Sequence, residues 1–66
     1  MTTEQLSEIA RAKKEEFLIA RATGASYERL KIIGNEYADA VARWHKAKWP
    51  GKKFFKPSVG YLIRAL

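Results

Sequence analysis

The sequence contains no cysteine and only one histidine, His45. Disulfides are therefore excluded as a source of stability, and the lack of thiols favours a reducing compartment. One imidazole and scattered carboxylates provide no ligand set with the spacing of a zinc site. We therefore expect no metal and no cofactor. A chain of 66 residues must then be held together by helix packing or by self-association.

Long hydrophobic runs are also missing. The longest run covers residues 17–20, far below the roughly 20 residues of a membrane-spanning helix. The first ten residues are polar and acidic, unlike a secretory signal. The sequence predicts a soluble, cytoplasmic protein with a single domain over residues 1–66.

The residues needed for catalysis are not brought together by the sequence pattern. His45 has no cysteine to activate, and the nearest preceding acid, Asp39, lies on a different face of the same predicted helix. Glu15 and Glu16 are adjacent, so they point to different faces. No glycine-rich phosphate loop is present. We predict that the protein is not an enzyme and has no catalytic residues.

Acidic residues are confined to one part of the chain. Residues 40–66 carry seven Lys/Arg and no Asp/Glu, whereas residues 1–39 carry six Lys/Arg and all seven acids. The two parts have net charges of +7 and −1, which give the net +6 of the whole chain. Such a one-sided field favours anionic partners.

The first 22 residues have the pattern of an amphipathic helix. Thr2 and Gln5 have the spacing of a capping box, which predicts a helix over about residues 3–22. Gly24 is placed to end it in a left-handed turn. The apolar stripe of this helix consists of Leu6, Ile9, Ala10, Phe17 and Ala20.

A second helix is predicted over about residues 27–49, with Ser26 as its cap and Pro50 after its end. Its apolar residues alternate three and four apart, the spacing of a helix that packs along another helix. They are Tyr27, Leu30, Gly34, Tyr37, Val41 and Trp44. Because the connection is about four residues long, the two helices must form an antiparallel hairpin.

The last ten residues predict a short third helix over residues 57–66, with Pro57 in its first turn. It has one apolar face, made of Val59, Leu62, Ile63 and Leu66. The expected fold is therefore all-α: a two-helix hairpin, a basic and aromatic loop over residues 50–56, and a docked C-terminal helix.

The stretch "IARATGASYERLKII" resembles the core of a helix-turn-helix motif. Ala20, Gly24 and Leu30 have the spacing of its buried alanine, its turn glycine and its buried aliphatic residue. The resemblance implies a recognition helix that begins near Tyr27 and places Arg29 and Lys31 close to a DNA groove.

The basic and aromatic stretch "RWHKAKWPGKKFFK", residues 43–56, is the main candidate binding site. Its candidate contacts with phosphate groups are Arg43, Lys46, Lys48, Lys52, Lys53 and Lys56. Trp49 is available to stack on an unpaired base. These residues predict nucleic-acid binding through phosphate contacts with little sequence preference. The alternatives are a regulator or inhibitor that docks on an acidic protein surface and, third, a membrane-surface role.

Leu18 and Ile32 fall well off the predicted apolar stripes, and Ile19 lies at the edge of one. All three are near the Gly24 end of the hairpin. A ten-residue helix that returns from the far end of the hairpin spans only about 15 Å, which leaves these residues open unless the loop first travels toward Gly24. A cluster of exposed apolar side chains on neighbouring helices favours a contact surface. The sequence therefore predicts a homodimer through this patch.

Overall fold

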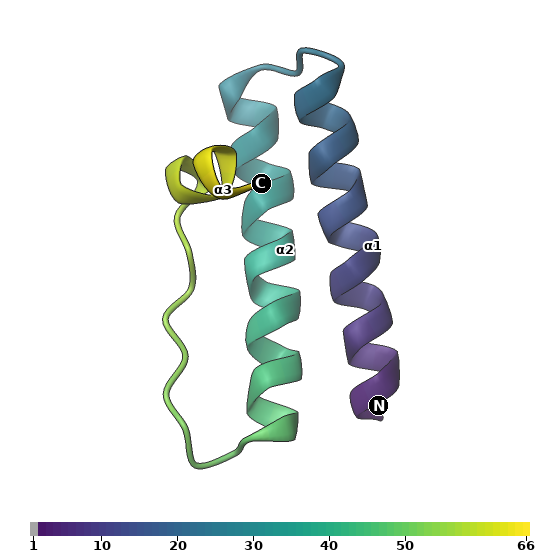
Figure 1. Ribbon diagram of the computed structural model, residues 1–66, viewed down its shortest axis with the longest axis vertical. Helices are drawn as coiled ribbons and strands as arrows, with labels where there is room; N and C mark the ends of the chain where they lie inside the picture. Colours follow the sequence, from purple (N-terminus) through teal and green to yellow (C-terminus); the bar gives the residue numbers. More distant parts are fainter. Residues whose placement is uncertain (1) are drawn as a thin grey trace.

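In the computed structural model, which describes residues 2–66, three helices follow one another along the chain (Figure 1). They are α1 (Thr3–Ala22), α2 (Tyr27–Lys48) and α3 (Val59–Ala65). α1 and α2 lie side by side and antiparallel, and α3 packs beside the half of α2 that is nearer the turn (Figure 1). The described residues contain no strand. The all-α prediction of a hairpin with a docked third helix is confirmed.

The ends of α1 follow the predicted chemistry. The Thr2 hydroxyl accepts a hydrogen bond from the Gln5 amide, and the Gln5 side chain accepts one from the Thr2 amide. Beyond the other end, Gly24 has φ +79°, the left-handed conformation that glycine adopts without a steric penalty. α1 is continuous between these ends and runs antiparallel to α2. The two helices of a helix-turn-helix motif cross at about 90–120°, so α1 and α2 do not have the geometry of that motif.

α2 begins as predicted, with the Ser26 hydroxyl accepting from the Arg29 amide. It ends at Lys48, which agrees with the predicted end at about residue 49. Trp49 has φ −132° and ψ 76°, because the ring of Pro50 disfavours the helical conformation in the residue before it. The turn of the chain after α2 therefore starts at Trp49.

Residues 49–66, here called the arm, run back along α2 and end in α3 (Figure 1). α3 begins at Val59, and the prediction of a helix starting at Pro57 is wrong at that end. The Ser58 hydroxyl accepts from the Tyr61 amide and is the N-cap, so Pro57 precedes the cap. Residues 50–52 turn the chain, and residues 53–58 then run along α2 without helical structure (Figure 1). Extended residues advance about 3.3 Å each, about twice the rise of a helix, so this segment carries α3 far along α2.

The core lies where α3 meets the hairpin. Phe17 is completely buried between the helices. It is surrounded by buried aliphatic residues of α2 and α3: Leu30, Ile33, Val59 and Leu62. The predicted apolar face of α3 is confirmed, since Ile63 and Leu66 also pack against this cluster.

The predicted seam of α2 is partly wrong. Tyr27 is 58% exposed, and Tyr37, Val41 and Trp44 are only half-buried. The buried residues of α2 are Leu30, Ile33, Gly34, Ala38 and Ala40. They form a wider arc than a hairpin seam, because α2 is covered by α1 on one side and by the arm on another (Figure 1).

The patch predicted for self-association is only partly open. Ile19 and Ile32 are 63% and 61% exposed, whereas Leu18 is half-buried. The arm does reach this end of the hairpin, but it covers the other face. Arg21 binds backbone oxygens of α3, and Ile19 lies about 200° around α1 from Arg21. Ile32 likewise lies about 200° around α2 from Gly34, which packs against α3.

Candidate functional site

Four aromatic rings gather where α2 ends and the arm begins. The rings of Trp44 and Trp49 meet edge to face, with their centroids 5.4 Å apart. His45 lies 5.1 Å from Trp49 and 5.0 Å from Phe54, which belongs to the returning arm. The cluster therefore fixes the start of the arm against the last turn of α2, and Trp49 remains 39% exposed.

Lys48 stands over this cluster. Its ammonium lies 5.2 Å from the ring centroid of Trp44 and 4.9 Å from that of Trp49. Cation–π contacts at exposed sites contribute about 0.5–1 kcal/mol each. Because the lysine is exposed, its ammonium lies at the surface beside two indole rings.

Most of the basic residues of the C-terminal part have no carboxylate partner. The ion pairs among the described residues are Lys13–Glu16, Lys13–Glu36 and Lys56–Asp39. Among residues 2–66, Lys56 is thus the only predicted phosphate contact that is neutralised by an ion pair. The others, without an ion pair in the described structure, are Arg43, Lys46, Lys48, Lys52 and Lys53.

The Lys56–Asp39 pair ties the middle of the arm to α2. The hydrogen bond from Lys56 and its charge lower the pKa of the Asp39 carboxyl, and the more distant Arg43 guanidinium lowers it further. Both partners are exposed to solvent. Lys56 therefore has a structural contact inside the molecule as well as its predicted place in the binding surface.

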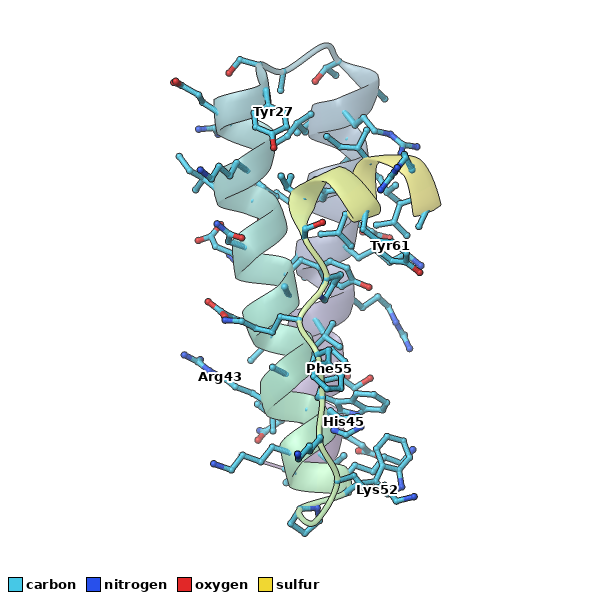
Figure 2. The ribbon with its side chains drawn as sticks, turned by 90° about the vertical axis from the view of Figure 1, so that its left-hand side faces the viewer. Tyr27, Arg43, His45, Lys52, Phe55 and Tyr61 are labelled. Atoms are coloured by element: carbon cyan, nitrogen blue, oxygen red, sulfur yellow. The ribbon has the colours of Figure 1, made fainter. Side chains whose placement is uncertain are left out.

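The predicted contacts lie on two sides of the hairpin end. Arg43 and Lys52 project to opposite sides of α2 (Figure 2). Lys46 and Lys48 are two positions apart on one helix and so point about 200° apart. The structure therefore separates Arg43 and Lys46 from the side that carries Lys48, the two indole rings and Lys52.

On the Lys48 side, a groove runs between α1 and α2. We call it the Trp44 groove; it has a volume of about 260 Å³ and is lined by Ser7, Ala10, Arg11, Lys14, Tyr37, Val41 and Trp44. Arg11 and Lys14 are exposed, and neither forms an ion pair with a carboxylate of residues 2–66. The sequence prediction missed both residues, although their spacing of three places them on one face of α1.

The opposite groove of the hairpin has a different electrostatic character. It has a volume of about 230 Å³ and is lined by Leu6, Ile9, Lys13, Glu36, Asp39, Ala40 and Arg43. Lys13 lies between Glu16 at 3.8 Å and Glu36 at 3.7 Å. Acidic and basic groups compensate one another here, so this groove offers less attraction to an anion than the Trp44 groove does.

Other kinds of site find no support in the described part of the chain. Residues 2–66 contain no group of histidine and carboxylate side chains able to hold a metal ion. The Nδ1 atom of His45 is buried without a hydrogen-bond partner, between aromatic rings. None of the three helices combines the length and the apolar character needed to cross a bilayer.

A scan of protein-family models and searches of curated proteins and of solved structures found no match to this chain.

Proposed function

We propose that this protein is a small, non-enzymatic module that binds nucleic acid through phosphate contacts. One observation carries the proposal: exposed lysines that form no ion pair within residues 2–66 follow one another where α2 ends, and the first of them stands over two indole rings. Lys48 lies over the rings, and Lys52 and Lys53 follow it after Pro50. Unpaired cations of this kind are free to replace the counterions that surround a phosphate backbone.

The same arrangement implies little sequence preference. Contacts to phosphate position a protein on nucleic acid but carry no base information. Trp49, which is 39% exposed, is available to stack on an unpaired base. Such stacking contributes about 1–3 kcal/mol per base and tolerates every base.

A protein partner with an acidic surface is the second candidate. The observation that favours it is the exposure of Phe55, 86%, and of Tyr61 on the outside of the arm. Both rings project from the arm in Figure 2. Aromatic anchors next to basic groups suit a protein interface as well as a nucleic acid.

The deciding experiment is fluorescence anisotropy of labelled single-stranded and duplex oligonucleotides of mixed sequence, measured across a salt series. We expect binding that weakens with salt. The double variant Lys52→Gln/Lys53→Gln should reduce the slope of log K against log salt by about 0.7–0.9 for each lost phosphate contact.

The matched control is Lys13→Gln, which removes one positive charge that Glu16 and Glu36 already compensate. It should leave the slope almost unchanged. Absence of binding at the lowest salt, or wild-type binding by the double variant, would reject the proposal in favour of a protein partner.

A further inference from the structure

We propose that the Trp44 groove is a binding site for unpaired nucleotides, so that the protein prefers single strands over duplexes. This inference rests on the proposed function and assigns a part of the ligand to a particular groove. In it, a base lies against Trp44, and the phosphates on either side of that base contact Arg11 and Lys14.

The charge of the groove favours an anion. Its lining contains Arg11 and Lys14 and no acidic residue. Lys48 adds a third cation, since its ammonium is 5.2 Å from the Trp44 ring that lines the groove. The positive charge of the groove thus comes from both α1 and α2. The buried core around Phe17 holds these two helices together.

The size of the groove favours part of a polymer over a free small molecule. Pockets for drug-sized ligands have volumes of about 300–1,000 Å³, whereas this groove has about 260 Å³. It is lined by the rings of Tyr37 and Trp44 together with apolar and basic side chains. An aromatic surface flanked by cations matches the chemistry of one nucleotide: a flat base and a charged backbone.

The need for an unpaired base follows from the same geometry. In a duplex, the faces of each base are stacked on its neighbours, so no base face is free to meet a protein ring without extrusion. The phosphates of a duplex can still contact Lys52 and Lys53 at the end of the hairpin. Duplex binding therefore uses the lysines alone, and single-strand binding uses the lysines and the groove.

The groove also joins the exposed aromatic surface. Trp44 contacts Trp49 edge to face, and Lys48 lies over both rings. A strand that leaves the groove at Trp44 therefore meets Trp49 and then the lysines that follow Pro50. Lys52 projects to the side of α2 opposite Arg43 (Figure 2), so Arg43 does not contribute to this path.

The test compares a labelled single strand with a duplex that contains the same strand. The variant is Arg11→Gln/Lys14→Gln, which changes two exposed residues and leaves the core intact. We expect the single-strand salt slope to fall by about 1.4, from two contacts of about 0.7 each, with no change in the duplex slope. The matched control, Arg29→Gln/Lys31→Gln, removes the same charge from the other end of α2. It should affect neither slope, because α1 and α2 are antiparallel and do not present these residues as a recognition helix.

A second measurement reports on the groove directly. The chain has two tryptophans, so Trp49→Phe leaves Trp44 as the sole indole. The single strand should quench its fluorescence at saturation, and the duplex should not. This readout does not depend on any change to the groove itself.

The outcomes separate the two proposals. If single strand and duplex bind equally, and the Arg11→Gln/Lys14→Gln variant behaves as its control does, the groove is not the site and phosphate binding by the lysines stands. If Trp44 is not quenched by a saturating single strand, the groove proposal is likewise overturned. If neither nucleic acid binds at low salt, both proposals fail.

Discussion

Gly34 of α2 packs directly against the side chain of Val59 of α3. A Cβ atom at position 34 would be 3.2 Å from the Val59 Cγ2 atom. It would also be 3.3 Å from Leu62 Cδ1 and from Phe17 Cε2. The absence of a side chain at one position of α2 therefore allows all three helices to meet in the core.

Replacing Gly34 by alanine tests this contact. The change improves helix propensity by about 1 kcal/mol, but overpacking a filled core typically costs about 1–3 kcal/mol. Because the new methyl group meets three side chains, and Phe17 is completely buried, we expect a net loss of stability. Thermal denaturation followed by circular dichroism measures it.

Gly60→Ala is the control. A Cβ atom there would meet only the Ser58 Oγ atom, at 4.0 Å. This variant gains propensity without a clash and should be more stable than wild type by about 0.5–1 kcal/mol. A Gly34→Ala variant stabilised to the same degree would show that α3 does not pack closely on α2.

The Lys56–Asp39 pair predicts how the arm responds to acid. The folded state lowers the pKa of the Asp39 carboxyl, so the pair stabilises the fold above the unfolded pKa of about 3.9. That stabilisation is lost as the pH falls through the lower folded value. Lys56→Gln should raise the pKa of Asp39 toward its ordinary range, as measured by carboxyl-carbon NMR titration.

Arg43→Gln is the comparison, because Arg43 acts on Asp39 through charge alone and is the weakest cause of the shift. It should raise the pKa of Asp39 by less than Lys56→Gln does. A larger effect of Arg43→Gln would mean that the Lys56 contact is not formed in solution.

Arg21 predicts a local effect on α3. Its guanidinium donates to the backbone oxygen of Ile63 at 2.6 Å and also to that of Leu66, where the helix has its negative end. Hydrogen bonds from charged groups contribute about 1.5–3 kcal/mol. Both hydrogen bonds of Arg21 are only part-buried, so we expect a value near the lower end. Arg21→Gln should therefore cost about 1–2 kcal/mol and speed hydrogen exchange in α3.

Amides in the middle of α1 and α2 should keep their protection in that variant, because the hairpin has its own contacts. Arg11→Gln, on the same helix but without these bonds, should leave α3 exchange unchanged. Equal acceleration in all three helices would indicate that α3 and the hairpin unfold as one unit.

The hairpin and its caps were predictable from the sequence because their causes are local. Thr2 and Gln5 form their capping box within one turn, and Gly24 needs only its own left-handed conformation. The face of α3 followed from the spacing of Val59 and Leu62 for the same reason.

The arrangement around α2 was less predictable because it depends on distant residues. The seam prediction assumed one neighbouring helix, and Tyr27 was placed inside for that reason. In the structure the arm is a second neighbour of α2, and the buried residues include Ala38 and Ala40, which the seam prediction did not contain. The Trp44 groove was missed because it joins Arg11 and Trp44, whose proximity only the folded hairpin creates.

The hairpin carries an exposed apolar patch that favours self-association. Ile19 and Ile32 are each more than 60% exposed on the face of the hairpin that α3 does not cover. Leu18, on the same helix as Ile19, is half-buried and adds less surface. Exposed apolar side chains on adjoining helices favour a contact, and a two-fold dimer is the simplest closed form. We expect wild-type protein to dimerise with increasing concentration, as measured by sedimentation equilibrium.

Ile32→Lys should shift the protein to monomer, because a dimer would bury the new charge in an apolar contact. The control is Phe55→Ser, which removes an equally prominent apolar side chain, 86% exposed, from the arm. It should leave the dimer intact if Ile19 and Ile32 form the interface. Dissociation by Phe55→Ser alone would move the interface to the arm, and a wild type that stays monomeric at every concentration would exclude the dimer.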